Sequence, residues 1–191
     1  MDFLKLQNIH VMYDPDEIDA CYKQPCHEVY DRIFVGSLRV IHDPKEIENN
    51  EITHVVSCLN EYPVRQIIER EASEKVMTIF DSPKTWLFIE RFDDRDNVKI
   101  GDIVKRTNKF ISEAMKDKNA KVLIHCSAGV SRSASIAIAY IMTKEKSSLN
   151  DILTKMREKR CILNPNLGFR RQLIEIRSLN EKSDDVLYKY M

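Results

Sequence analysis

Residues 121–142 join a short apolar strand to a helix that is apolar on almost every side, through a loop that contains glycine and serine. The pattern predicts the strand at residues 121–125 (KVLIH) and the helix at residues 133–142 (SASIAIAYIM). A helix without a polar face must be covered all round by other elements, so we expect this helix inside the fold. The segment therefore favours a layered α/β domain over an open or extended structure.

Other strands and helices alternate along the chain, which predicts a single domain with a central mixed sheet flanked by helices. Further strands are predicted at residues 32–35, 52–59, 75–80 and 86–92. Helices are predicted at residues 100–115, which repeat apolar residues at i, i+3, i+4 and i+7, and at about residues 167–179. Ser148 and Asp151 form a capping-box pattern that opens another helix. Asp43 is expected to cap a short helix that has Pro44 in its first position.

The length and composition fit one soluble globular domain. A chain of 191 residues can bury a full core, and 43% of its residues are hydrophobic and 31% charged. No apolar run approaches the roughly 18 residues that a membrane-spanning helix needs, and the first ten residues do not resemble a signal peptide. Five irregularly spaced cysteines predict free thiols in a reducing compartment, the cytoplasm or the nucleus, with neither a disulfide framework nor a zinc site.

The net charge of zero hides a difference between the two halves of the chain. Residues 1–100 hold 12 basic and 20 acidic side chains, a net charge of 12 − 20 = −8. Residues 101–182 hold 17 basic and 8 acidic side chains, a net charge of 17 − 8 = +9. A basic half suits an anionic ligand, although a solvated basic face is the commoner explanation. A catalytic motif in the basic half would favour the anionic ligand over the solvated face.

That chemistry is predicted in the loop between strand and helix, His125–Ser133 (HCSAGVSRS). A loop that enters a helix amino terminus turns successive backbone N–H groups toward one point, where an anion binds. Gly129 allows backbone angles that other residues resist, and the fork of Arg132 matches two phosphate oxygens. The same positive field favours the thiolate of Cys126 as nucleophile. A structural cysteine in a serine-rich turn would leave the arginine unexplained.

The predicted phosphate-binding residues are those that follow the nucleophile: Ser127, Ala128, Gly129, Val130, Ser131 and Arg132. Ser133 can hydrogen-bond the sulfur and ease its departure. The motif His-Cys-x5-Arg-Ser resembles the signature of protein tyrosine phosphatases, and the helix after it resembles that of the dual-specificity branch, in its small, atypical type. The resemblance includes RIFVGSL, ITHVVSCLN and NPNLGFRRQL, and covers residues 28–180. It implies an amino-terminal extension at 1–27, a catalytic domain at 28–180 and a tail at 181–191.

Phosphatases of this kind also use an aspartic acid that protonates the leaving oxygen. The candidates are Asp93, Asp94 and Asp96. The family pattern places the acid two residues after an apolar position and six before the first apolar residue of the next helix. Asp94 meets both conditions and lies 126 − 94 = 32 residues before the nucleophile, so it is the predicted acid and Asp96 the second choice. One or more of the three belongs to a solvated acidic turn.

The resemblance implies a two-step reaction through a phosphocysteine, with no metal or cofactor. His125 is expected to support the loop rather than act as a base. Asn166 is expected either to brace the loop from the adjoining turn or simply to cap a helix. Peroxide should oxidise Cys126 to a sulfenic acid, and whether Cys58 or Cys161 could resolve it depends on distances.

The expected substrates are phosphorylated proteins, at tyrosine and at serine or threonine, with no nucleic-acid or membrane partner. The chain has no segment like the Lys-Asn-Arg-Tyr loop of phosphotyrosine-only enzymes, and its cysteine loop has no lysine of the kind that phosphoinositide phosphatases carry. Alternatives are a catalytically weak phospho-binding module, a phosphatase of RNA 5′-phosphates and a rhodanese-like sulfurtransferase. Relatives that only bind usually lose the Cys, Arg or Asp, and the sulfurtransferase needs a shorter loop.

Overall fold

The computed structural model describes residues 13–188, and they contain one five-stranded mixed sheet in the order β1-β2-β5-β3-β4. The strands are β1 (Cys26–Tyr30), β2 (Ile33–Gly36), β3 (His54–Ser57), β4 (Trp86–Phe88) and β5 (Val122–His125). β1 runs antiparallel to β2, and the pairs β2–β5, β5–β3 and β3–β4 are parallel. The predicted α/β class with a central mixed sheet is confirmed.

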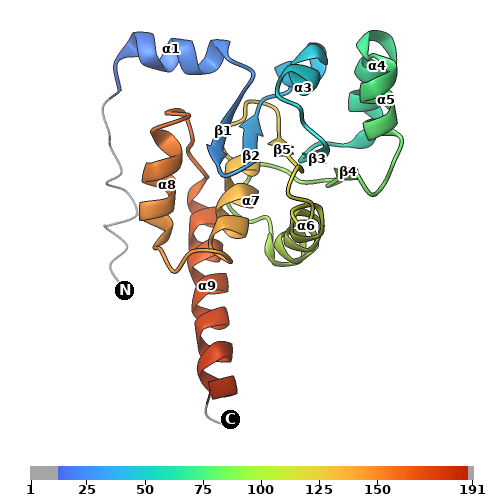
Figure 1. Cartoon of the computed structure of the whole chain (residues 1–191). Coiled ribbons are helices and arrows are strands. Elements are labelled where there is room, and N and C mark those ends of the chain that lie inside the picture. Colours follow the sequence, from blue (N-terminus) through green and yellow to red (C-terminus); the bar gives the residue numbers. More distant parts are fainter. Residues whose placement is uncertain (1–12, 189–191) are drawn as a thin grey trace.

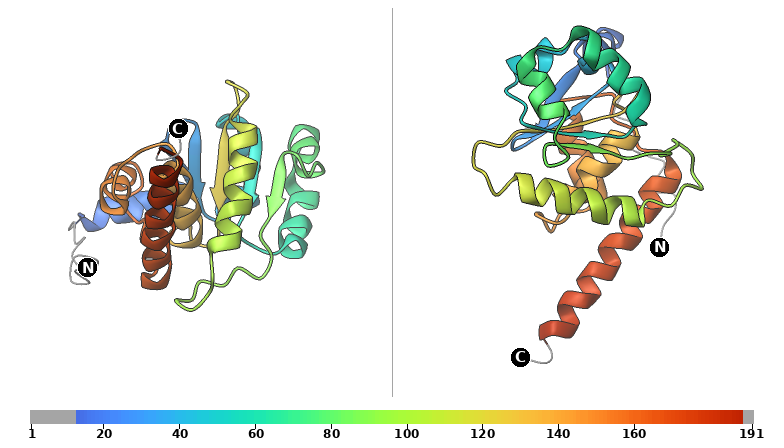
Figure 2. Two further views of the ribbon diagram at one scale, coloured as in Figure 1. Left: turned by 90° about the horizontal axis from the view of Figure 1, so that it is seen from below. Right: turned by 90° about the vertical axis from the view of Figure 1, so that its right-hand side faces the viewer.

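Alternate residues of the central strands face opposite helical layers, because successive side chains of a strand point to opposite faces. Val122 and Ile124 belong to one buried cluster and Leu123 to the other. The first cluster is covered by α6 (Gly101–Ala114), α7 (Arg132–Ile141), α8 (Leu149–Arg157) and α9 (Leu167–Tyr188). The second is covered by α2 (Arg39–His42), α3 (Lys45–Asn49), α4 (Glu61–Glu71) and α5 (Glu74–Phe80). The two layers are visible in Figures 1 and 2.

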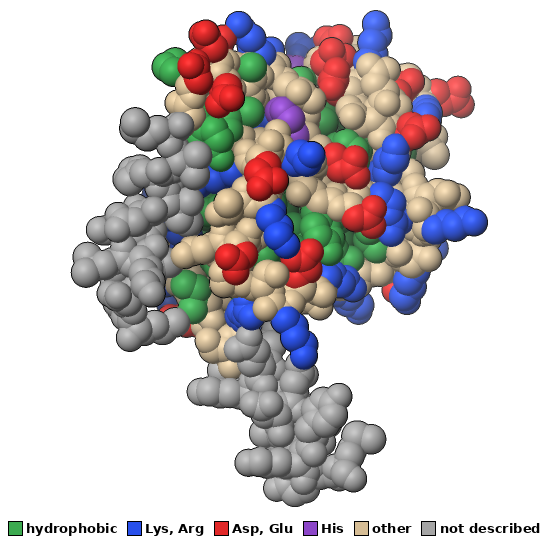
Figure 3. All heavy atoms as spheres, turned by 60° about the vertical axis from the view of Figure 1, so that its left-hand side comes forward, with side chains coloured by type: hydrophobic (Ala, Val, Ile, Leu, Met, Phe, Trp, Pro, Cys, Tyr) green, Lys and Arg blue, Asp and Glu red, His purple; other side chains and the backbone are tan. Residues whose placement is uncertain are grey.

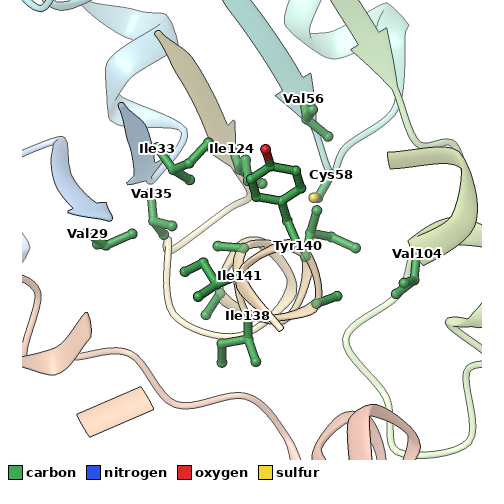
Figure 4. Packing of buried hydrophobic residues seen from close by; sticks show 14 of the residues in the cluster. Val29, Ile33, Val35, Val56, Cys58, Val104, Ile124, Ile138, Tyr140 and Ile141 are labelled. Atoms are coloured by element: carbon green, nitrogen blue, oxygen red, sulfur yellow. The ribbon is translucent and has the colours of Figure 1, made fainter. Parts of the chain in front are cut away.

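Helix α7 lies at the centre of the first cluster. Every residue from Ser133 to Ile141 is buried, as its apolar sequence predicts. Figure 4 looks along this helix: Tyr140 points toward Ile124 and Val56 of the sheet, and Ile138 points the opposite way. Burying one such side chain stabilises the fold by about 1.5–3 kcal/mol. This packing holds the start of α7, and the loop before it, against the middle of the sheet.

The predicted strand at residues 75–80 is wrong, because these residues form helix α5. Ser73 caps the helix by accepting the N–H of Val76 at 3.3 Å. Val76 and Phe80, four residues apart, are both buried, so the helical period decides this segment although it contains β-branched residues. The predicted strand at residues 86–92 is shorter than expected, since β4 ends at Phe88.

Two helix predictions also need correction, and one helix was not predicted. The short helix α3 begins at Lys45, with Pro44 in the cap position and no side-chain capping bond, so Asp43 does not cap it. Helix α4 at Glu61–Glu71 was not predicted. Helix α9 continues to Tyr188, beyond the predicted end near residue 179. The capping box of Ser148 and Asp151 is confirmed.

The amino-terminal segment has regular structure from residue 15. Helix α1 (Pro15–Lys23) is capped by Asp14, and the sheet begins at Cys26, two residues before the expected start of the catalytic domain. The rest of the expected extension, residues 1–12, lies outside the described residues. On the face drawn in Figure 3, acidic and basic side chains are interspersed, so the charge difference between the halves does not appear there as one basic patch. Within residues 13–188 no helix is long and apolar enough to cross a membrane.

Candidate active site

The loop Cys126–Ser131 connects the end of β5 to the start of α7. The strands next to β5 position this loop, because β5 lies between two parallel strands, β2 and β3, that end at the same edge of the sheet. The N–H of Cys126 donates to the carbonyl of Gly36 at 3.3 Å, and the N–H of Leu38 donates to the carbonyl of Ser127 at 3.0 Å. The loop is therefore shaped by the sheet before any ligand arrives.

The sulfur of Cys126 lies inside this loop, in a residue that is only 2% exposed. The N–H of Gly129 donates to it at 3.3 Å, and the hydroxyl of Ser133 lies 3.2 Å away. Gly129 has φ +67°, and a Cβ there would stand 2.6 Å from the backbone of Gly36. Only glycine satisfies both conditions, as the sequence predicts for this position.

The guanidinium of Arg132 lies beside the loop and has a buried donor without a partner. Its Nη1 donates to the carbonyls of Cys58, at 3.3 Å, and Phe92, at 3.1 Å, which fixes its orientation. Its Nε is buried without a hydrogen-bond partner in the part of the chain that the structure describes. A buried donor without a partner is costly unless a ligand occupies the site, so the loop and Arg132 together suit an anion.

Of the three candidate acids, Asp94 is the one that reaches the loop. Its Oδ1 accepts the hydroxyl of Ser131 at 2.6 Å and the amide of Asn166 at 2.7 Å. Asp93 and Asp96 are exposed side chains of the same turn, which fits a solvated acidic segment. The structure thus brings the carboxylate of Asp94 to the rim of the loop that holds Cys126.

Asn166 does both of the things that the sequence left open. Its Oδ1 accepts the N–H of Phe169 at 2.8 Å, which caps α9, while its Nδ2 donates to Asp94 and its own N–H donates to the hydroxyl of Ser131 at 3.1 Å. One residue therefore ties the helix start, the acid and the loop together, the first two through its side chain and the loop through its backbone N–H. The cap orients the amide, because using the oxygen for the helix leaves the nitrogen as donor.

The segment that carries Asp94 rests on the first turn of α9. Phe92 packs against Phe169 with ring centroids 5.5 Å apart. Gly168 lies so close to the backbone of Asp96 that a Cβ at this position would stand 2.5 Å from its C and Cα atoms. The sequence analysis did not single out Gly168. A glycine inside the first turn of a helix was the available indication, because glycine is unfavourable there without a reason.

Arg160 is a second residue that the sequence analysis missed. It is fully buried, and its Nε donates to the carbonyl of Gly129 at 3.1 Å. Its Nη1 contacts Nδ1 of His27 at 2.8 Å. Burial and the charge of Arg160 lower the pKa of His27 to about 4, which keeps this histidine a neutral acceptor. In the sequence, an arginine after a helix is indistinguishable from a solvated one.

His125, the last residue of β5, is fully buried. Its Nε2 lies 2.6 Å from the hydroxyl of Ser57, which also accepts the indole N–H of Trp86 at 2.9 Å. Trp86 can only donate, so the Ser57 oxygen accepts its indole N–H, and toward Nε2 the same hydroxyl donates or accepts according to the tautomer of His125. Burial, and in smaller part the charge of Arg132, lower the pKa of His125 to about 3. His125 is therefore neutral, and this geometry gives it a supporting place.

The arrangement can hold a tetrahedral anion over a sulfur nucleophile, with a carboxyl group at the rim. Backbone N–H groups and Arg132 supply the positive charge, and Ser133 supplies a hydroxyl to the sulfur. Among residues 13–188, no group of three or more His, Cys, Asp or Glu side chains is placed to hold a metal ion. The structure thus brings the side chains of Cys126, Ser133 and Asp94 to one loop.

Comparison with known proteins agrees with this geometry. A family model described as the catalytic domain of dual specificity phosphatases matches residues 33–178. Among curated proteins, a probable dual specificity protein phosphatase of Dictyostelium discoideum is 32% identical over 144 residues, 75% of this chain and 46% of that protein. Mouse dual specificity protein phosphatase 19 is 31% identical over 144 residues, 74% of this chain and 57% of that protein. The chain thus spans about half the length of these relatives.

Solved structures have the same fold. A human tyrosine phosphatase-like serine/threonine/tyrosine-interacting protein is 25% identical, with a TM-score of 0.65 over 81% of this chain and 97% of that one. Human DUSP28 is 21% identical, with a TM-score of 0.67 over 83% of this chain and 96% of that one. At 21% identity the second match speaks to the fold alone.

Proposed function

This chain belongs to the dual specificity phosphatase family, and from that membership and the site geometry we propose that it hydrolyses phosphotyrosine and phosphoserine or phosphothreonine in proteins. The observation that carries the proposal is the convergence on Cys126 Sγ of the Gly129 N–H and the Ser133 hydroxyl, with Asp94 tied to the same loop through Ser131. A binding module would need the anion site but not the carboxyl group at its rim.

In the proposed first step, the thiolate of Cys126 attacks phosphorus in line with the leaving oxygen. The sulfur–phosphorus bond forms as the phosphate ester bond breaks, and Asp94 gives its proton to the departing oxygen. The loop amides and Arg132 bind the three equatorial oxygens, where the charge of the transition state concentrates. Fixed donors of this kind need no reorganisation during the reaction.

In the proposed second step, water attacks the phosphocysteine and Asp94, now ionised, takes a proton from that water. The sulfur–phosphorus bond breaks, and the hydroxyl of Ser133, 3.2 Å from the sulfur, stabilises the departing thiolate of Cys126. Inorganic phosphate leaves and the thiolate is restored. His125 takes no part in proton transfer in this scheme, because it stays neutral and lies beneath the loop.

Two features support the proposed substrate class. Ser127 and Ala128, at the tip of the loop, are exposed, so a short phosphoserine side chain could reach the sulfur as well as a phosphotyrosine. The loop residues 127–131 include no lysine that would bind extra phosphates of an inositol ring. A cytoplasmic or nuclear location is part of the proposal, and it is supported by five cysteines that are all free thiols.

The test is hydrolysis of p-nitrophenyl phosphate, followed by paired phosphotyrosine and phosphothreonine peptides, with EDTA present throughout. The chain is compared with Cys126→Ser and Asp94→Asn. We expect turnover that the first variant abolishes and the second reduces on the order of 10²–10⁴-fold. Tight phosphopeptide binding without turnover by the unaltered chain would overturn the proposal in favour of a binding module.

A further inference from the structure

Two thiols outside the phosphate loop lie in contact. Cys21 belongs to α1 and Cys161 to the loop after α8, and their sulfurs are 2.9 Å apart although 140 positions separate them in the chain. Both residues are free thiols and both are partly exposed. A disulfide needs a sulfur separation of about 2.05 Å, so a shift of less than 1 Å would allow the bond to form.

The pair is polarised, with hydrogen-bond donors converging on one sulfur. The backbone N–H of Cys161 donates to Sγ of Cys21 at 3.3 Å, and the single thiol proton of Cys161 has two acceptors in reach, Sγ of Cys21 at 2.9 Å and the carbonyl of Glu17 at 3.7 Å. Burial and the bond to Cys21 raise the pKa of Cys161 to about 12, so Cys161 keeps its proton. This polarity assigns Cys21 as the sulfur that attacks an oxidant, and Cys161 as the thiol that follows.

Helix α1 has little else to hold it in place. None of its residues is buried. Its carboxyl end is held by polar contacts to its backbone: Nη1 of Arg160 donates to the carbonyls of Cys21, at 3.3 Å, and Gln24, at 3.2 Å, and Arg39 donates to the carbonyl of Tyr22 at 3.0 Å. A covalent bond in this position would therefore change how firmly α1 is attached.

The other three cysteines do not offer such a pair. Cys26 and Cys58 are buried away from an oxidant, whereas Cys21 and Cys161 are both partly exposed. Cys126 lies inside the phosphate loop. Arg160 joins the two regions, because the guanidinium that holds Cys21 also donates to the carbonyl of Gly129 in that loop. The thiol pair therefore lies behind the site and does not overlap it.

We propose that Cys21 and Cys161 form a redox-active pair that closes into a disulfide and locks α1 onto the loop after α8. The thiolate of Cys21 attacks one oxygen of a peroxide, whose O–O bond breaks, giving a sulfenic acid on Cys21 and, after protonation, water. The sulfur of Cys161 then attacks the sulfur of Cys21. It loses its proton and releases the second water. Two thiols lose two electrons, and one peroxide is reduced to two waters.

The experiment treats the chain with hydrogen peroxide in a Cys126→Ser background, which removes the competing thiol, and maps peptides without reduction. We expect a peptide that links Cys21 to Cys161. We also expect a melting temperature raised by about 5 °C or more, because the bond closes a long loop of chain, and dithiothreitol should reverse both changes. Cys21→Ser and Cys161→Ser should each remove the rise, and Cys26→Ala is the matched control that keeps it.

Three results would overturn the inference. The first is that both Cys21 and Cys161 remain free thiols after peroxide treatment. The second is a disulfide from either residue to a different cysteine or to a second chain. The third is a disulfide between Cys21 and Cys161 that leaves the melting temperature unchanged. None of these readouts depends on phosphatase activity, so the inference and the proposed function can fail separately.

Discussion

Replacing Gly168 by alanine should uncouple the acid from the nucleophile. A Cβ at this position would stand 2.5 Å from the C and Cα atoms of Asp96 and closer still to its carbonyl oxygen, and ordinary contact begins near 3.4 Å, so one backbone must retreat by at least roughly 3.4 − 2.5 = 0.9 Å. The bonds from Asp94 to Ser131 and Asn166, 2.6 and 2.7 Å long, cannot all survive such a shift. A misplacement of about 1 Å can cost on the order of 10²-fold in rate.

The assay compares kcat/KM for aryl phosphates whose leaving phenols differ in acidity. A poorly acidic phenol needs the proton of Asp94, so its ester should lose on the order of 10²-fold in Gly168→Ala, and an acidic phenol such as p-nitrophenol should lose far less. The matched control is Gly101→Ala, where a Cβ meets nothing within 4 Å at the start of α6. It should leave activity unchanged and stabilise the chain by up to about 1 kcal/mol. Equal losses for all esters, or none, in Gly168→Ala would refute this reasoning.

Three further outcomes are expected. Asn166→Asp keeps an acceptor for the N–H of Phe169 but removes the amide donor that positions Asp94, so kcat/KM for poor leaving groups should fall about tenfold or more. Less than about 1 kcal/mol should be lost in urea unfolding, because the cap remains; unchanged kinetics would contradict the contact. Ser133→Ala should slow hydrolysis of the phosphocysteine, so that stopped-flow mixing shows a burst of phenol, and linear release would argue against a role in the second step. His125 should remain neutral to about pH 4 in an NMR titration. The pKa of His125 in the folded protein lies below the ordinary 6.5, so the unfolded chain binds the proton first as the pH falls. About 2 kcal/mol of the free energy of unfolding is therefore lost between pH 7 and pH 5. A pKa near 6.5 for this ring in the folded protein would contradict the prediction.

The local sequence was enough to predict the loop that carries the nucleophile. Cys126, Gly129, Arg132 and Ser133 lie within eight residues, between a strand and a helix whose apolar sequences require burial. A fold that buries both elements places this loop where the strand ends and the helix begins, so its position follows from the local sequence. The choice of Asp94 rested on spacing in a resembled pattern, and the structure places that carboxylate on the loop.

The wrong prediction of a strand at residues 75–80 shows where the local sequence was insufficient. Val76, Thr78 and Ile79 favour a strand by residue type, and the same segment also has apolar residues at helical spacing. Packing against the second cluster, which buries Val76 and Phe80, decided in favour of the helix. Short apolar segments are ambiguous because either period can bury them, and only the neighbouring surface determines which period fits.

By itself, the sequence determined the α/β layering and the chemistry of the cysteine loop, because both depend on residues that are neighbours in the chain. Tertiary structure alone decided what supports that loop. Arg160 meets the carbonyl of Gly129, Gly168 lies against Asp96, and Cys21 touches Cys161. These contacts join residues 31 to 140 positions apart and follow no period, so they exist only after the sheet and its two helical layers have brought distant segments together.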